Sequence, residues 1–244
     1  MRDLDQCQTE FIGYELGFES YSISCVHQIK VPAFRNWVDL QAIHPIEGQS
    51  SYRELLSLQD HQRVALYAGN MGEKQGLEII IEAARRLQFR EDLVFVLCGN
   101  GAAAERIRAL GSQVPNICWL RIQPIQQLNS LLNLADIHLL PQRTAAADLV
   151  MPSKLTGMLA SGRPVVATAA PDTRIYKVVS KCKLTVEPGN VADFAAAMLR
   201  LADDRELQKQ LGRRAREIAE SDLCMEAVLT HFEEDLLRIC SAGH

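Results

Sequence analysis

Short apolar blocks alternate with amphipathic stretches along the chain from Arg63 onward. Each block is apolar at successive positions and rich in Val, Ile and Leu, which is typical of parallel strands covered by helices on both faces. Six such blocks occur, at residues 64–69, 93–99, 116–122, 137–142, 164–169 and 182–188. We expect them to form six strands of one sheet.

Between these blocks, apolar residues recur at i, i+3 and i+4, the period of an amphipathic helix. The clearest stretches are residues 76–87, 102–110, 125–135, 153–162 and 192–202. Regular alternation of strand and helix predicts an α/β fold with a Rossmann-like, doubly wound parallel sheet.

The pattern divides the chain into three parts. Residues 1–60 show little periodicity and include Pro32 and Pro45, so we expect a loop that leads into the fold, or the remnant of a preceding domain and its linker. Residues 61–203 hold the six predicted strands and would form the ligand-binding domain. Residues 204–244 are rich in charge and predict extra C-terminal helices.

Composition narrows the class of protein. The chain is 48% hydrophobic and 23% charged with a formal net charge of −4, which gives no bulk attraction for nucleic acid. The seven cysteines form no CxxC pair, so we expect neither a disulfide framework nor a metal site, and a cytoplasmic protein. No apolar run approaches the roughly 18 residues of a membrane span, although peripheral attachment at the inner face of the membrane stays open.

The loop after the first predicted strand is suited to a phosphate group. It reads GNMGEKQG and contains Gly69, Asn70, Gly72 and Lys74. Glycines let the backbone approach a ligand closely, a helix N-terminus offers free N–H groups, and Lys74 adds a full positive charge. We expect a diphosphate here, although a tight turn with a solvated lysine explains the same residues.

The loop after the second predicted strand is also glycine-rich. Gly99, Asn100 and Gly101, followed by Ala104, fit the G-x-G-x-x-A form of the dinucleotide fingerprint. That fingerprint normally follows the first strand, and the acidic residue expected about 20 positions further on is absent. Arg121 stands in that region instead, so an NADP-binding oxidoreductase remains an alternative.

Residues 141–168 form the most distinctive segment. Ser153 follows a proline at a predicted helix start, and Lys154 falls in the first turn, where a cation opposes the helix dipole. Lys154 is therefore better placed to face an anion than to stabilise the helix, although a solvated lysine also fits. Asp148, just before this helix, is a candidate acceptor for a sugar hydroxyl, or simply a polar loop residue.

Several segments together resemble the nucleotide-sugar glycosyltransferases of the two-Rossmann-domain (GT-B) architecture, family 4, in their C-terminal, donor-binding half. These segments occur in the family's order and spacing at residues 36–40, 69–72, 75–78, 95–101, 134–142 and 151–168. The PSKL motif at 152–155, combined with GNMG at 69–72, is most similar to exopolysaccharide enzymes such as the colanic-acid type of fucosyltransferase.

The resemblance implies transfer of a sugar, with retention of configuration, from a nucleoside diphosphate to a saccharide or lipid-linked saccharide acceptor. The nucleotide sugar is the substrate, and no metal or separate cofactor is implied. The candidate catalytic residues are Lys154, Lys74 and Asp148. By position, Asn70, Gly72, Lys74, Ser153 and Lys154 would contact phosphates, the residues near Gly99, Asn100, Gly101 and Pro124 would approach the base, and Asp148 and Leu149 would lie over the sugar.

The chain departs from this family in three respects. Asn70 and Gln75 replace an Arg and a Lys that are common in the family, so phosphate neutralisation would fall on Lys74 and Lys154. The family's paired glutamates map near Leu149 and Gly157, and neither is acidic. Residues 1–35 are too few for the acceptor-binding Rossmann domain.

The missing half leaves three interpretations of the whole chain. It could work with a separate N-terminal acceptor domain or as a homodimer, and would be incomplete alone. A non-catalytic nucleotide-sugar-binding scaffold is a second interpretation, and a sugar epimerase of the same two-domain architecture is a third.

Overall fold

The computed structural model describes residues 36–143, 153–171, 173–180 and 184–242. Six parallel strands form one sheet in the order β3-β2-β1-β4-β5-β6, which is the doubly wound order. The strands are β1 (Arg63–Ala68), β2 (Leu93–Cys98), β3 (Ile117–Leu120), β4 (Ile137–Leu140), β5 (Val165–Thr168) and β6 (Thr185–Val186). All six predicted strands are confirmed, as is the α/β class.

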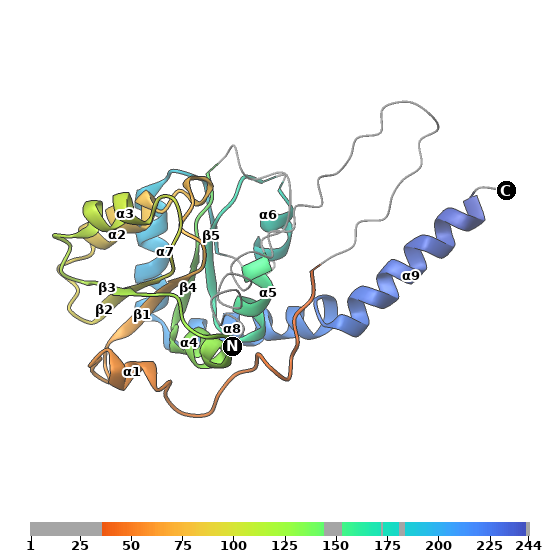
Figure 1. Cartoon of the computed structure of the whole chain (residues 1–244), viewed down its shortest axis with the longest axis horizontal. Helices are drawn as coiled ribbons and strands as arrows, with labels where there is room; N and C mark the ends of the chain where they lie inside the picture. Colours follow the sequence, from red (N-terminus) through yellow and green to blue (C-terminus); the bar gives the residue numbers. More distant parts are fainter. Residues whose placement is uncertain (1–35, 144–152, 172, 181–183, 243–244) are drawn as a thin grey trace, which may run out of the picture.

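Helices cover both faces of the sheet (Figure 1). On one face lie α2 (Glu78–Arg86), α3 (Ala104–Gly111) and α7 (Val191–Asp203). On the other lie α1 (Tyr52–Leu55), α4 (Leu128–Leu134), α5 (Ser153–Ala160) and α6 (Arg174–Val179). Two single 3-10 turns, η1 (Glu73–Gln75) and η2 (Ile125–Gln127), follow β1 and β3.

The core explains the continuous apolar blocks. Along β1, Tyr67 packs in the cluster under α2 and α7, whereas its neighbour Leu66 packs in the cluster under α1 and α4. In β2, Phe95 and Val96 alternate between the same two faces. Because each face is covered, successive residues are all buried and no polar residue alternates with them.

Part of the predicted lead-in segment is packed against the body. Ile43 is buried, and Val38 forms an isolated bridge with Cys224. Tyr52 is buried in the short helix α1, and its hydroxyl oxygen lies 2.9 and 2.6 Å from Oε1 of Gln123 and of Gln127, either of which can accept its proton. The pattern of residues 36–60 did not indicate this helix.

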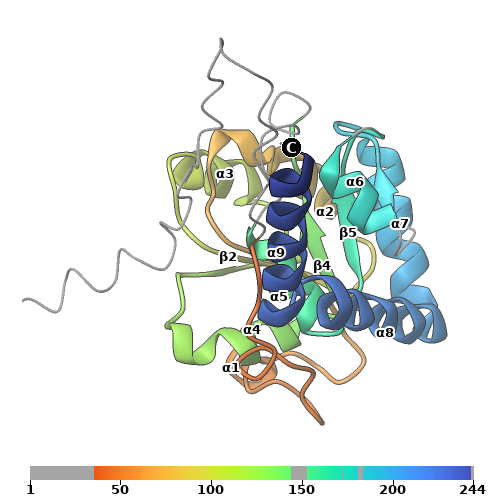
Figure 2. The same ribbon diagram turned by 90° about the vertical axis from the view of Figure 1, so that its right-hand side faces the viewer.

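Two long helices end the described chain, α8 (Arg205–Asp222) and α9 (Met225–Ala242). The first packs closely: a Cβ on Gly212 would meet the carbonyl oxygen of Gly162 at 2.3 Å. The second projects from the body in Figure 1 and lies in front of it, toward the viewer, in Figure 2. Of the helices that can be described, none combines the length and apolarity that crossing a bilayer requires.

Candidate functional site

The loops after β1 and β2 lie against each other at the carboxyl edge of the sheet. The backbone N–H of Met71 donates to the carbonyl of Asn100 at 2.8 Å, and the N–H of Ala103 donates back to the carbonyl of Met71 at 2.8 Å. The predicted phosphate loop is therefore fixed from one side by the second glycine loop.

Glycine is required where these loops touch. A Cβ on Gly99 would lie 1.9 Å from the carbonyl oxygen of Gly69, and a Cβ on Gly101 would lie 2.3 Å from Oδ1 of Asn70. Gly69, Gly99 and Gly101 also have positive φ angles of 148°, 151° and 149°. Packing of one loop on the other thus explains the G-x-G spacing without a dinucleotide, and the NADP-binding alternative loses its main support.

Lys154 reaches this loop from the first turn of α5. Its Nζ lies 3.2 Å from the hydroxyl of Tyr67 and 4.8 Å from the centroid of that ring. A Cβ on Gly69 would be 3.4 Å from Cδ of Lys154, so the lysine stem packs on the glycine. Tyr67 is fully buried and its hydroxyl donates to the carbonyl of Asn70 at 2.5 Å. Tyr67 therefore ties Lys154 and the β1 loop together.

The remaining predicted residues are less closely grouped. Gly72 precedes η1, and Lys74 is exposed within it. Ser153 is exposed at the first position of α5. Pro124 is exposed beyond β3, which β2 separates from β1. Asp148 and Leu149 lie outside the described residues.

A cluster of four charges borders the β1 loop. Arg106 bridges Glu73 and Glu78 at 2.7 Å each, and Arg143 pairs with Glu78 at 2.6 Å and with Glu73 at 3.9 Å. The backbone N–H of Arg143 also donates to the carbonyl of Lys74 at 3.1 Å. The loop after β4 is thereby attached to the loop after β1, across the point where the strand order reverses.

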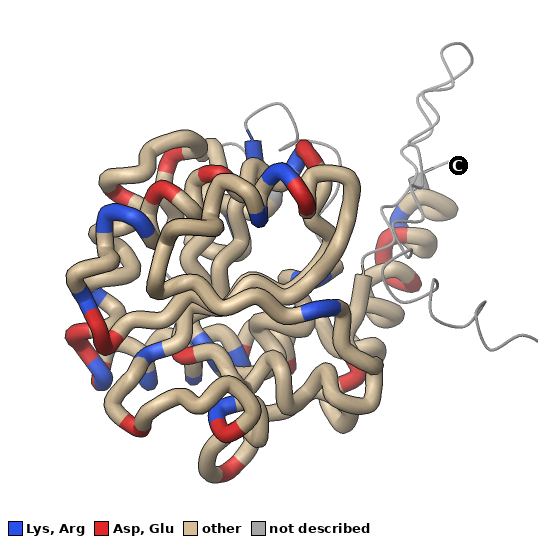
Figure 3. Tube along the Cα trace, turned by 60° about the vertical axis from the view of Figure 1, so that its left-hand side comes forward, with Lys and Arg blue, Asp and Glu red and all other residues tan. Residues whose placement is uncertain are grey.

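The ion pairs change the titration of Glu78. Partial burial alone would raise the pKa of this carboxyl group. Hydrogen bonds from its own backbone N–H and from Arg106, with the charges of Arg143 and Arg106, outweigh that effect and lower the pKa below its ordinary value. The lowered pKa keeps Glu78 ionised at neutral pH, so that it offsets positive charge beside the β1 loop. Elsewhere along the chain trace, residues of the two signs are interspersed (Figure 3).

Two residues that shape the candidate site, Tyr67 and Arg143, were not predicted from the sequence. In the sequence, Tyr67 fits the hydrophobic pattern of the strand. Its hydroxyl near the strand end could still have indicated a role in the site. Arg143 comes shortly after β4, at the edge of the sheet where ligands bind, so its position could have identified it. No group of three or more His, Cys, Asp or Glu side chains suited to a metal ion occurs among the residues with described positions.

Residues 62–204 match the family of Glycosyl transferases group 1. This match covers more than half of the chain, and the chain belongs to that family. It is 35% identical over 210 residues to the putative colanic acid biosynthesis glycosyl transferase WcaI of Escherichia coli. The aligned part is 83% of this chain and 50% of that protein.

Solved structures of the same architecture agree with the fold. A glycosyltransferase from Rickettsia africae superposes with a TM-score of 0.72 at 15% identity, over 88% of this chain and 59% of the other. Anabaena HepE in complex with UDP-glucose superposes with a TM-score of 0.70 at 14% identity, over 83% and 56%. The chain spans about half, or less, of the length of the curated relatives it matches.

Proposed function

We propose that this chain is the donor-binding part of a glycosyltransferase that moves a sugar from a UDP- or GDP-linked donor to a polysaccharide or lipid-linked saccharide. Membership of the group 1 family supports the class of reaction. Similarity to the colanic acid protein supports a role in exopolysaccharide synthesis. One observation carries the placement of the site: the Nζ of Lys154 is held over Tyr67 beside the glycine loop that follows β1.

In this proposal the diphosphate lies at the carboxyl edge between the loops after β1 and β4. The backbone of residues 69–72 approaches the phosphates, Lys154 and Lys74 neutralise their charge, and the hydroxyl of Ser153 donates a hydrogen bond to a phosphate oxygen. Negative charge grows on the leaving diphosphate as the glycosidic bond breaks, so cations fixed beforehand stabilise the transition state more than the ground state. Hexosyl or fucosyl transfer would proceed with retention of configuration.

The rest of the donor extends from this point. We place the base near Asn100 and Pro124, beyond the ends of β2 and β3, and the sugar near Asp148 and Leu149. HepE, which has the same fold, was solved with UDP-glucose, which supports a uridine nucleotide as the first one to test. A GDP-linked sugar is the alternative donor.

The acceptor would bind against a second wall. We propose a separate N-terminal domain or a second copy of the chain as that wall, because transfer requires an oriented acceptor and exclusion of water from the reacting centre. We therefore expect this chain alone to bind the donor without transferring its sugar. Its place would be the cytoplasm, with peripheral attachment to the membrane where a lipid-linked acceptor is used.

A ligand panel tests this function. The purified chain is titrated with UDP, GDP, UDP-glucose, GDP-fucose and NADP, followed by thermal shift and ligand-observed NMR. We expect one nucleoside diphosphate and its sugar to stabilise the protein, because both share the diphosphate. Stabilisation by NADP alone, or by no nucleotide in a folded sample, would contradict the proposal.

The Lys154→Ala variant tests whether the nucleotide binds beside Lys154. Losing a charged hydrogen bond to a phosphate should weaken binding at least tenfold, or about 1.4 kcal/mol. Lys177→Ala is the matched control, because Lys177 is an exposed lysine on α6. Equal affinity in the two variants would remove Lys154 from the site.

A further inference from the structure

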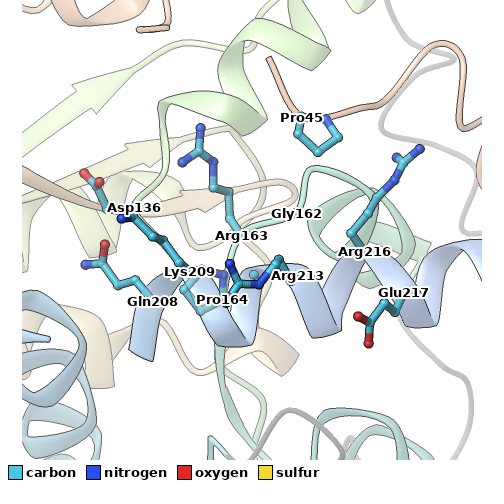
Figure 4. A pocket seen from close by; sticks show the side chains of 11 residues that line it. Pro45, Asp136, Gly162, Arg163, Pro164, Gln208, Lys209, Arg213, Arg216 and Glu217 are labelled. Carbon is cyan, nitrogen blue, oxygen red and sulfur yellow. The ribbon is translucent and has the colours of Figure 1, made fainter. Parts of the chain in front are cut away.

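A pocket with several charged lining residues lies at the opposite edge of the sheet from the glycine loops. It has a volume of about 460 Å³ and lies beside the segments that lead into β4 and β5, with α8 as its other wall (Figure 4). Its charged lining residues are Asp136, Arg163, Lys209, Arg213, Arg216 and Glu217. Four cations thus meet two carboxylates, although the chain as a whole is negatively charged.

Helix periodicity brings three of the cations together. Lys209, Arg213 and Arg216 are four and three residues apart, so they share one face of α8. Arg216 is fixed in place: its Nη1 donates to the carbonyls of Ile43 and Ala160 at 3.0 and 2.8 Å, and it pairs with Glu220 on the same helix at 2.7 Å. Lys209 pairs with the exposed Glu206 at 2.9 Å.

Arg163 supplies the observation that points to a ligand. Its Nε is buried and has no hydrogen-bond partner among the residues that can be described. Burial lowers the pKa of this guanidinium, and the charge of Asp136 offsets only part of that effect. A desolvated cation with an unused donor is costly unless an acceptor completes it.

The nearest carboxylates serve other groups. Asp136 accepts from the backbone N–H of Val64 at 2.8 Å and lies 3.8 Å from Arg53. Glu217 points away from Arg163 (Figure 4). Arg163 and Arg213 therefore line the pocket without a carboxylate placed to accept their hydrogen bonds.

We propose that this pocket binds a phosphate group, with the guanidinium groups of Arg163 and Arg213 as its principal donors. Guanidinium groups suit phosphate because their N–H donors match its oxygens in pairs. The phosphate comes from a free anion or from the headgroup of an anionic phospholipid. The site is separate from the donor crevice, because it lies at the amino ends of the strands.

Arginine side-chain NMR tests the pocket directly. In a protein with 15N-labelled arginine, the Nε–H resonance of Arg163 is assigned with Arg163→Lys, and inorganic phosphate is titrated in. We expect a saturable shift of this resonance, with affinity roughly tenfold weaker in Arg213→Ala. Arg86→Ala, which removes an exposed arginine from α2, should leave the titration unchanged, as should Lys154→Ala. Arg213 is exposed, so its variant keeps the test open if Arg163→Lys does not fold.

Vesicles distinguish the two sources of the phosphate. Sedimentation with phosphatidylglycerol vesicles is compared with phosphatidylcholine vesicles, for the wild type and for Arg213→Ala. Binding to phosphatidylglycerol alone, lost in Arg213→Ala, assigns the group to a headgroup, whereas a response to inorganic phosphate alone assigns a free anion. Absence of both responses, or responses that Arg213→Ala leaves intact, would overturn the proposal.

Discussion

The two edges of the sheet are held in different ways, although both carry buried polar atoms without partners among the described residues, Oε1 of Gln75 and of Gln142 at the carboxyl edge. At the carboxyl edge the glycine loops bond to each other, and Lys154 rests on Tyr67. At the amino edge, Nε of Arg163 and Nδ1 of His138 are buried without partners among the described residues. The first edge is therefore held by close backbone fit, whereas the second depends on charge and solvation. Substitutions that add atoms should therefore lower stability most at the carboxyl edge. Changes of pH or added anions should alter the stability contributed by the amino edge.

The largest expected effect is a steric one at the carboxyl edge. Gly99→Ala places a methyl group 1.9 Å from the carbonyl oxygen of Gly69, on backbone that cannot yield as a side chain would. We expect a loss of more than about 4 kcal/mol in the free energy of unfolding, measured by urea denaturation.

Gly48→Ala is the control for backbone strain alone. Gly48 also has a positive φ, of 86°, but nothing lies within 4 Å of an added Cβ. Its cost should be about 1 kcal/mol. Equal losses in the two variants would show that the contact between the loops contributes nothing.

The amino edge should respond to pH through His138. Burial, assisted by the charge of Arg163, lowers the pKa of this histidine from 6.5 to about 3. Below pH 6.5 the unfolded chain binds a proton that the folded chain excludes, so stability falls with decreasing pH by up to about 1.4 kcal/mol per unit. Urea denaturation between pH 7 and 5 should give a flatter profile for His138→Gln, since its unfolded state lacks this proton site.

His231→Gln, which replaces an exposed histidine on α9, is the matched control. Replacement of His138 also breaks its 3.0 Å contact with Ser161, so the variant is less stable at neutral pH. The slope is therefore the quantity to compare. A slope as steep as that of the wild type would assign the pH dependence to other groups.

A smaller effect is expected from the hydroxyl of Tyr67. Tyr67→Phe keeps the ring beneath Lys154 but removes the hydrogen bonds to Asn70 and Lys154. We expect about 1 kcal/mol lower stability and a moderate loss of nucleotide affinity, smaller than in Lys154→Ala. Tyr176→Phe on α6 is the matched control, and calorimetric titration measures both. If affinity were unchanged in Tyr67→Phe, that hydroxyl would not position the lysine.

The smallest expected effect lies in the ion pairs that border the β1 loop. A double-mutant cycle on Glu78 and Arg143 should give a coupling energy of about 0.5 kcal/mol, because both side chains are partly in water. The coupling should weaken in high salt. A coupling that salt leaves unchanged would contradict a screened, solvent-exposed pair.

The sequence determined the sheet well because its blocks are buried on both faces. Leu66 and Tyr67 pack on opposite sides, so the pattern could not be taken for an amphipathic strand. The helix α1 was not foreseen, because a four-residue helix is too short for periodicity to show. Tyr52 is buried through contacts with segments distant in the sequence.

The candidate site was predictable where its chemistry lies in local motifs. Gly69, Gly99 and Lys154 were identified from strand ends and a helix start, and the structure brings them together. The roles of Tyr67 and Arg143 depend on which strands are neighbours. That β1 lies beside β4 emerges only from the folded sheet. The pocket around Arg163 was missed for the same reason.

The most direct test of the donor site is a map of backbone amide shifts during titration with UDP and with GDP. The account predicts that one of them shifts the amides of Gly69, Asn70 and Gly72 and the first turn of α5, while α8 stays unchanged. Lys154→Ala should reduce these shifts at equal nucleotide concentration. Shifts centred on Arg163 and α8, with the glycine loops unaffected, would place the nucleotide at the other edge and contradict the account.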